Sequence, residues 1–322
     1  GKIPAGRVVL MGQILVDRVL QGARPIHGGG SEWARDGGTH VGGGFNALVA
    51  ARRMGAEAIS LSPIGTGPHA SMIEAALARE GIVDAGPRVD GVDNGFCVAM
   101  IGHDAERTFI STKGAETMTP ETAWADFVRT MSPGDVLYID GYLMDHPANR
   151  EAAETALRVL PEGVHVLLDV SPVIGIPESL PTRHAIISMN SVEARAIAKQ
   201  SRLDGYLPFD SLSCHLAQTL GRNTLIRLGA SGACFARSAS PDSETSAAHI
   251  PTPTVDAVDT NGAGDAHTGV LAASLALGIP LERGLVLANC AGAMASTMPG
   301  PASCPTREDI EAAADALSES GN

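Results

Sequence analysis

The residues of this chain that are best suited to do chemistry lie in a glycine-rich run directly before an apolar segment. The run Gly262 to Asp265 reads Gly-Ala-Gly-Asp and precedes residues 266–277, which are apolar and helix-forming. The backbone N–H groups of the run should therefore point out of a helix N-terminus, which binds anions without any side-chain charge. The glycines let the backbone approach a phosphate closely, and the Asp265 carboxylate then reaches an attacking hydroxyl. The run predicts phosphoryl transfer; a tight turn followed by an Asp that only caps its helix is the alternative.

Alternating strands and helices must position this run. Apolar stretches bounded by turn residues predict strands at 8–11, 14–20, 59–64, 135–140, 164–169, 185–188 and 224–228. Helical patterns fall at 42–54, 70–80, 120–131, 149–160, 191–199, 209–220, 262–277, 281–297 and 307–317. Strands separated by helices predict an α/β fold with a doubly wound, mainly parallel sheet flanked by helices. Because there is no internal repeat or long linker, we expect residues 1–322 to form a single domain.

Three segments interrupt the alternation. Residues 28–38 are polar and rich in glycine, and the short strands expected at 96–101 and 107–111 form a hairpin around a turn-like stretch. A second hairpin is expected from 233–236 and 249–250, with the solvated stretch 238–246 as its tip.

Composition argues against several kinds of partner. The chain has 23 basic and 36 acidic residues, a net charge of −13, and no basic stripe that could follow a nucleic-acid backbone. No apolar run approaches the roughly 20 residues that span a bilayer, and the first residues lack the apolar core of a signal peptide. Cysteines are five in number and form no C-x-x-C pair, which disfavours disulfides and zinc. We therefore expect a soluble protein of the reducing cytoplasm that binds neither nucleic acid nor membrane.

The full string from Asp259 to Asp265, Asp-Thr-Asn-Gly-Ala-Gly-Asp, closely resembles the C-terminal signature of the ribokinase-like (PfkB) carbohydrate kinases. The resemblance implies that Asp265 is the catalytic base, which takes the proton of the substrate hydroxyl. It also implies that the amides of Gly262, Ala263 and Gly264 form the anion hole for the transferring phosphoryl group. ATP and Mg²⁺ are then the expected cofactors.

Other motifs of the family match in the expected order. On the substrate side, the resemblance assigns sugar binding to Asp17, to Gly42 and Gly43, and to Asn46. An exposed strand Asp and an ordinary glycine-rich turn are the alternatives for these motifs. A lid sheet over the sugar, formed by about 13–40 and 92–112, would exclude water, and pairing of lid edges makes a homodimer plausible. Arg107 on this hairpin either reaches the substrate or is a solvated arginine at the lid edge, and we expect the second.

On the nucleotide side, Asn190 and Glu193 match Asn-x-x-Glu, in which the Glu positions magnesium through water. A capped helix start would show the same spacing. The resemblance also assigns ATP binding to a loop with Leu228, Gly229 and Gly232 and to a helix with Asn289 and Ala293. A monovalent cation such as K⁺ is expected beside Asp259, Asn261 and the stretch 296–301, although Asn261 replaces the more usual Thr.

Two departures from the family pattern bear on the site. Where many members carry Gly-x-Asp-x-x-Gly, this chain reads Gly65-Thr66-Gly67-Pro68-His69-Ala70, so a common substrate contact is missing. His267 stands where Phe is common. We interpret it as a structural histidine on a helix surface, and a histidine that faces the site is the alternative.

Other classes of protein have weaker support. The P-loop pattern G-x-x-x-x-G-K-[ST] is absent. Residues 42–47 satisfy the dinucleotide pattern G-x-G-x-x-A, but the preceding segment 32–39 is polar and not the buried strand that pattern requires. A non-catalytic sugar-binding or regulatory protein would not need Asp265. We therefore expect a kinase for a small sugar such as ribose or fructose. A nucleoside kinase is the alternative, disfavoured because aromatic residues make up only 3% of the chain.

Overall fold

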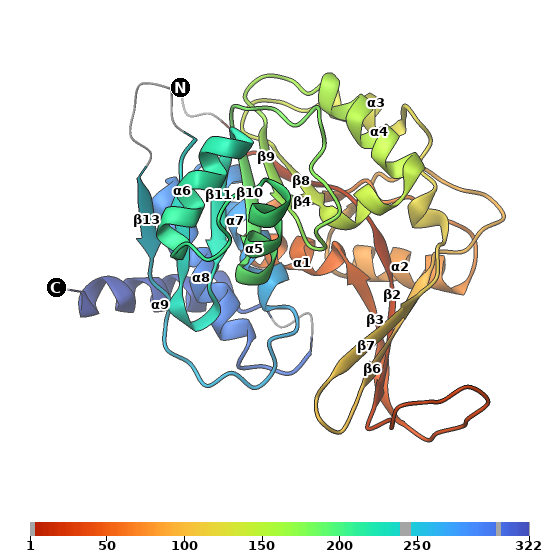
Figure 1. Cartoon of the computed structure of the whole chain (residues 1–322). Coiled ribbons are helices and arrows are strands. Elements are labelled where there is room, and N and C mark those ends of the chain that lie inside the picture. Colours follow the sequence, from red (N-terminus) through yellow and green to blue (C-terminus); the bar gives the residue numbers. More distant parts are fainter. Residues whose placement is uncertain (1–3, 239–245, 301–303, 322) are drawn as a thin grey trace.

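The computed structural model describes residues 4–238, 246–300 and 304–321. Its main sheet, within these residues, has nine strands in the order β13-β12-β11-β10-β9-β8-β1-β4-β5 (Figure 1). Neighbouring strands are parallel from β11 to β5, and β12 and β13 add an antiparallel edge. The strands are β1 (Arg7–Met11), β4 (Glu57–Ser60), β5 (Val83–Asp84), β8 (Val136–Asp140), β9 (His165–Asp169), β10 (Ala185–Asn190), β11 (Asn223–Arg227), β12 (Ala233–Ala236) and β13 (Ala247–Ile250).

Helices cover both faces of this sheet, as the doubly wound prediction requires. The strand β1 shows why, since Val8 and Leu10 belong to one apolar core while Val9 and Met11 belong to the other. The first core is closed by α1 (Phe45–Arg53), α2 (Pro68–Arg79), α7 (Ala263–Ala276), α8 (Leu281–Ala295) and α9 (Arg307–Ser320). The second is closed by α3 (Ala123–Val128), α4 (Pro147–Arg158), α5 (Ser191–Gln200) and α6 (Phe209–Leu220). The predicted α/β fold is therefore confirmed.

Helix α7 lies in the middle of its layer and is apolar almost all round. Residues 266–274 of this helix are buried, and it packs between α1 and α8. A Cβ atom on Gly269 would lie 2.1 Å from the carbonyl oxygen of Ala47 in α1, so this glycine permits the close approach of the two helices. Burial of the whole helix holds its N-terminus in one place at the edge of the sheet.

A separate four-stranded sheet, in the order β3-β2-β6-β7, projects from the main body (Figure 1). Its strands are β2 (Ile14–Gln21), β3 (Arg35–Gly43), β6 (Phe96–Ile101) and β7 (Arg107–Ser111). The predicted hairpin at 96–111 is present, and β6 pairs in parallel with β2. This small sheet is called the lid below.

The glycine-rich segment before the first helix belongs to the lid sheet as expected, although no strand was predicted within it. Residues 35–43 form β3, which pairs with β2 across a register shift between Arg18 and Leu20. A Cβ atom on Gly37 would lie 2.7 Å from the side chain of Val19, so the close passage of the two strands requires a glycine there. Most of β3 is exposed, which is why it lacks an apolar pattern and cannot be the buried strand of a dinucleotide fold.

Other boundaries differ by a few residues. The strand predicted at 59–64 begins at Glu57 and ends at Ser60, and the two-residue strand β5 was not predicted. The second predicted hairpin is present as β12 and β13, while residues 239–245 of its expected tip lie outside the described residues. Among the described helices, none has the length and apolar character needed to cross a membrane.

Candidate active site

A cavity of about 1050 Å³ opens where the carboxyl ends of the main-sheet strands meet the lid. Four neighbouring strands each end in a polar residue that lines it: Asp140, Asp169, Asn190 and Arg227. Parallel strands bring their carboxyl ends to one edge of the sheet, where open α/β sheets bind ligands. The lid contributes the opposite wall of the same cavity.

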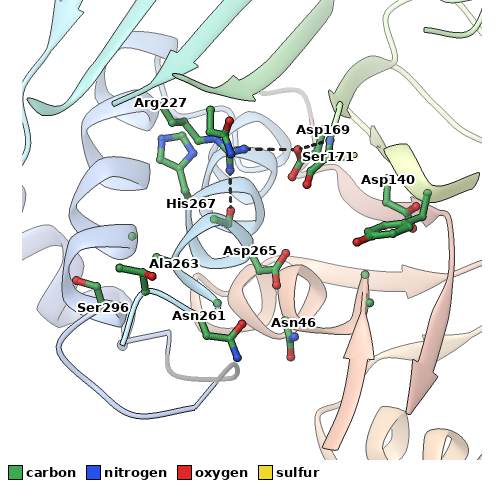
Figure 2. A pocket seen from close by; sticks show the side chains of 18 of the residues that line it. Asn46, Asp140, Asp169, Ser171, Arg227, Asn261, Ala263, Asp265, His267 and Ser296 are labelled. Atoms are coloured by element: carbon green, nitrogen blue, oxygen red, sulfur yellow. Dashed lines mark hydrogen bonds and ion pairs between the residues drawn. The ribbon is translucent and has the colours of Figure 1, made fainter. Parts of the chain in front are cut away.

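Asp265 lies in the first turn of α7 and points into this cavity (Figure 2). Burial and the neighbouring Asp169 carboxylate raise its pKa to about 7, against the opposing effects of Arg227 and of a hydrogen bond with Asn46. A carboxyl group with a pKa near neutrality can both accept and release a proton under ordinary conditions. The residue predicted as the base therefore lies in an environment suited to proton transfer.

The three residues before Asp265 also line the cavity, and they form the start of the helix. Gly262 adopts a left-handed conformation with φ of 84°, and the helix begins at Ala263. A Cβ atom on Gly264 would lie 3.0 Å from Nη1 of Arg227, so the backbone is bare where it faces the guanidinium. The predicted anion-binding backbone is thus exposed to the cavity beside the candidate base.

The residues predicted to bind substrate gather on the lid side. Asp17 in β2 lines the cavity, and burial raises its pKa to about 6 while His40 lowers it. Asn46 and Gly43 line the cavity as well, whereas Gly42 does not. A Cβ atom on Gly42 would lie 2.0 Å from Oδ2 of Asp17, so Gly42 acts by leaving room for that carboxylate.

Asn190 and Glu193 form a capping box at the start of α5. The Glu193 amide donates to Asn190 Oδ1 at 2.8 Å, and the Asn190 amide donates to Glu193 Oε1 at 2.8 Å. The capped helix start is therefore present, and Asn190 lines the cavity while Glu193 lies behind it.

The other residues predicted to bind the nucleotide also differ in whether they line the cavity. Gly229, Gly232 and Ala293 line the cavity, and Leu228 does not. Gly229 belongs to a short 3₁₀ turn (Gly229–Ser231) between β11 and β12.

Asn289 and His267 form a buried pair in α8 and α7. The Asn289 amide nitrogen donates to the carbonyl oxygens of Ile250 and Pro251, so its Oδ1 faces His267 Nε2 at 2.9 Å. Nε2 must then carry the proton and donate. Burial and the charge of Arg227 lower the pKa of His267 to about 3, so the ring is neutral. The expectation of a surface histidine is wrong, because His267 is 5% exposed and lines the cavity.

Asp259 is held in the loop before α7 by three donors. Arg107 of the lid donates to its Oδ1 at 3.1 Å, Asn261 N–H to the same atom at 2.9 Å, and Gly300 N–H to Oδ2 at 3.3 Å. These contacts lower the pKa of Asp259. Because Arg107 already balances its charge, the described residues do not fit a monovalent cation on this carboxylate. Asn261 lines the cavity, Asp259 does not, and Pro301 of the predicted cation stretch lies outside the described residues.

Arg107 is exposed on the lid strand β7, as expected for the lid edge, but it is not only solvated. Its guanidinium pairs with Asp259 across 152 positions of sequence and also lines the cavity. Sequence reasoning could not have paired these residues, because only folding of the lid over the loop before α7 brings them together.

A carboxylate does occupy the start of α2, where the family's Asp is missing. Asp93 accepts hydrogen bonds from the backbone of His69 at 3.1 Å and Ala70 at 2.8 Å. Gly67 has a φ of 147°, and a Cβ atom there would lie 2.4 Å from Cγ of Asp93. Asp93 caps the helix from another segment and does not line the cavity.

Sequence reasoning missed Asp140, Asp169 and Arg227. A signal was present, since each is the polar residue that ends an otherwise apolar strand. Burial and Asp169 raise the pKa of Asp140 to about 7, although it accepts backbone hydrogen bonds from Gln13 and Leu143. Asp140 therefore joins the start of the lid strand β2 to the floor of the cavity.

No protein-only metal cluster exists among the described residues, in the sense of three or more acidic, His or Cys side chains grouped to hold an ion. Asp169 and Glu193 each lie 3.6 Å from Arg227. Mg²⁺ usually binds through one or two carboxylates together with substrate phosphates and water. The residues present fit a metal that enters as the complex with a nucleotide.

A helix start that faces the cavity, a carboxyl group whose pKa lies near neutrality and a lid opposite them suit phosphoryl transfer to a hydroxyl. The fold and site therefore indicate a small-molecule kinase. The comparison with family models agrees. The chain belongs to the pfkB family of carbohydrate kinases, whose model matches residues 6–308.

Curated relatives are similar over most of the chain. The uncharacterized sugar kinase YegV of Escherichia coli is 32% identical over 277 residues, covering 84% of this chain and 82% of that protein. Aminoimidazole riboside kinase of Salmonella typhimurium is 28% identical over 275 residues, covering 80% and 82%. The chain is therefore a sugar kinase of this family, a phosphotransferase with a hydroxyl acceptor.

Solved structures show the same fold. Ribokinase of Thermotoga maritima has a TM-score of 0.78 at 21% identity, covering 96% of this chain and 98% of that one. Arabidopsis thaliana ribokinase, solved with ribose and ATP, has a TM-score of 0.78 at 21% identity, covering 96% and 99%.

Proposed function

We propose that this protein transfers the γ-phosphoryl group of ATP, taken as its Mg²⁺ complex, to a hydroxyl group of a small sugar. One observation carries the proposal. Asp265, the residues Gly262 to Gly264 at the start of α7 and the lid residue Asp17 line a single cavity. That cavity has room for a nucleotide on the main-sheet side and an acceptor on the lid side.

The roles follow from the positions. Asp265 accepts the proton of the acceptor hydroxyl as its oxygen attacks the γ-phosphorus. The bond from that phosphorus to the bridging oxygen breaks, and ADP leaves with the electron pair. The amides at the start of α7 stabilise the charge on the transferred group, and Mg²⁺ supplies further charge neutralisation when bound. The acceptor is held by Asp17 and Asn46.

The wall charges favour a neutral, hydroxyl-rich acceptor. Asp17 and Asp145 line the acceptor side of the cavity, and carboxylates accept hydrogen bonds from hydroxyl groups. Glu116 and Asp140 line it as well, although their carboxylates already accept backbone N–H groups. An acceptor that already carries a phosphate would meet these carboxylates with like charge, which Arg107 and Lys113 on the same side offset only in part. The ribose bound to Arabidopsis ribokinase has the chemistry that such a wall favours.

A nucleoside is the second candidate, and two aromatic residues support it. Phe109 of the lid and Tyr142 of a short 3₁₀ helix (Gly141–Asp145) line the cavity and are 60% and 55% exposed. Exposed rings can stack on a base. The relative named aminoimidazole riboside kinase has an acceptor of this broader kind.

A screen of acceptors tests the proposal. Release of ADP from Mg²⁺-ATP would be measured with pentoses, hexoses, ketoses, sugar phosphates and nucleosides. We expect turnover with one or more neutral sugars and none with their phosphates. Turnover only with nucleosides would replace the sugar by the second candidate. Binding of ATP without turnover on any acceptor would contradict the proposal and favour a non-catalytic protein.

The lid also supports a proposed homodimer. Its inner face carries Asp17 and Phe109 toward the cavity, while Val98 and Ile110 form a cross-strand pair on the other face. Ile110 is 60% exposed. Covering this face with a second lid would remove apolar surface from water. Light scattering on the purified protein would show twice the mass of one chain, and a monomer at all concentrations would contradict the proposal.

A further inference from the structure

Arg227 brings a positive charge to the edge of the main sheet inside the cavity. Among the described residues, the side chains of lasting positive charge that line the cavity are Arg107, Lys113 and Arg227. The first two come from the lid hairpin and the segment that follows it. Arg227 is the last residue of β11, and its side chain is 14% exposed. It is thus the cation that the rigid sheet, and not the lid, presents to the candidate anion hole.

The contacts of this guanidinium are loose. Its Nη2 lies 3.6 Å from Asp169 Oδ1 (Figure 2). The same atom lies 3.6 Å from Glu193 Oε1. Nη1 donates to the carbonyl oxygen of Gly264 at 3.5 Å, the long end of the hydrogen-bond range. The buried Nε has no partner among the described residues. A guanidinium has five N–H donors, so most of this hydrogen-bonding capacity is left without a close acceptor.

An incompletely satisfied buried cation costs free energy, and a ligand rich in acceptors removes that cost. Phosphate oxygens match the planar fork of a guanidinium and form short, charge-assisted hydrogen bonds with it. The carboxylates of Asp169 and Glu193, each at 3.6 Å, restrain the guanidinium but do not use up its hydrogen-bond donors. The site is therefore prepared for an anion that the protein itself does not supply.

The position of Arg227 relates it to the transferred group. Its contact with Gly264 is to the residue directly before Asp265, and Gly264 carries one of the bare amides at the start of α7. Burial raises the pKa of Asp265, and the positive charge of Arg227 opposes this rise. An anion bound to the start of α7 would thus lie beside both the amides and the guanidinium.

We propose that Arg227 is a further catalytic residue, which binds the phosphoryl chain of the nucleotide and stabilises the charge that develops as the terminal phosphoryl group moves to the acceptor. This inference rests on the proposed transfer from ATP. The guanidinium takes no part in bond making, since the hydroxyl proton goes to Asp265 and the electron pair of the broken bond goes to ADP. Asp169 and Glu193 are positioning residues that orient Arg227.

Binding experiments test the inference without knowledge of the acceptor. Calorimetry would compare Mg²⁺-ADP with adenosine on the wild-type protein and on Arg227→Met. Because hydrogen bonds to charged groups are each worth roughly 1.5–3 kcal/mol, we expect Arg227→Met to bind ADP about 10–100-fold more weakly. Adenosine, which lacks phosphates, should bind both proteins within about threefold.

The matched control is Arg222→Met. Arg222 lies just before β11, donates to the backbone carbonyl of Pro181 and does not line the cavity. The Arg222→Met variant should leave the ratio of ADP affinity to adenosine affinity unchanged. Arg227→Lys, which keeps the charge but not the fork, should recover part of the ADP affinity.

Turnover with any acceptor found in the screen supplies the second readout. Removal of one group that stabilises transition-state charge typically lowers kcat about 10²–10³-fold, and we expect this for Arg227→Met. If Arg227→Met does not fold, Arg227→Gln is judged by the same measurements. ADP affinity within threefold of wild type, or equal losses for ADP and adenosine, would overturn the inference. A wild-type protein without turnover would contradict the proposed kinase reaction but leave the ADP comparison intact.

Discussion

The guanidinium of Arg107, on the lid strand β7, lies 3.1 Å from the carboxylate of Asp259 in the loop before α7. Asp259 also accepts the N–H group of Asn261, and the backbone at 258–259 donates to Ser296. One ion pair thus connects the roof of the cavity to the loop that leads into Gly262. We therefore expect any movement of the lid to be coupled to the shape of the backbone at the start of α7.

Loss of this pair should weaken binding of the acceptor. Exposed or half-exposed pairs are worth roughly 0.2–1 kcal/mol, so Arg107→Met should raise the KM of the acceptor by up to about fivefold. The control is Arg237→Met, which breaks an exposed pair with Glu282 away from the cavity. Steady-state kinetics at low and high salt would measure both, and equal effects of the two variants would contradict the coupling.

Replacement of the proposed base should abolish most turnover. Asp265→Asn removes the proton acceptor while keeping the size of the side chain, and loss of a general base typically lowers kcat roughly 10²–10⁴-fold. Binding of ATP should be largely retained, because the amides at the start of α7 remain. The variant would be assayed with a verified acceptor, and near-native turnover would show that Asp265 is not the base.

The pH dependence of turnover should report the same carboxyl group. Its pKa is raised to about 7, so the protonated, inactive form predominates below this value and the ionised base above it. We therefore expect kcat/KM to rise about tenfold per pH unit on the acid side and to level off above neutrality. Rates would be measured in buffers of constant ionic strength. A profile that is flat down to pH 5 would be inconsistent with this assignment.

Gly42 should prove essential although it does not line the cavity. A methyl group at this position would meet Oδ2 of Asp17 at 2.0 Å and must displace that carboxylate. Misplacement of a positioning group by about 1 Å can cost roughly 10²-fold, so Gly42→Ala should lower kcat/KM for the acceptor by about 10–100-fold. ADP affinity should not change. Gly28→Ala, where an added Cβ meets nothing within 4 Å, serves as the control.

Glu116 should stabilise the base of the lid hairpin. Its carboxylate is 2% exposed and accepts the N–H groups of Gly95, before β6, and Gly114, after β7. Glu116→Ala leaves both buried donors unpaired, at about 1–3 kcal/mol each in the free energy of unfolding. Urea unfolding would measure the loss. Glu154→Ala, which removes a less buried carboxylate that also accepts two backbone N–H groups, should cost clearly less.

Parts of the fold and site that depend on neighbours in sequence could be predicted. The helix start at Gly262 to Asp265 is local, because its turn, its bare amides and its acidic side chain all follow from four consecutive residues. The alternation of apolar strands and helices likewise predicts the layered sheet, since each period reflects which faces are buried. Recognition of the family then assigned Asp17 and Asn46, and the structure places both in the cavity.

Contacts between distant segments were decided only by the tertiary structure. Arg227 and Asp169 meet because β10 lies between β9 and β11 and aligns their carboxyl ends, which no local pattern encodes. The strand β3 was missed since its glycines are needed for close passage beside β2 and its exposed face carries no apolar period. Local propensity and periodicity thus determined the elements and the turn that we propose to bind phosphate. The pairing of strand ends and the closure of the lid determined which charged groups surround that turn.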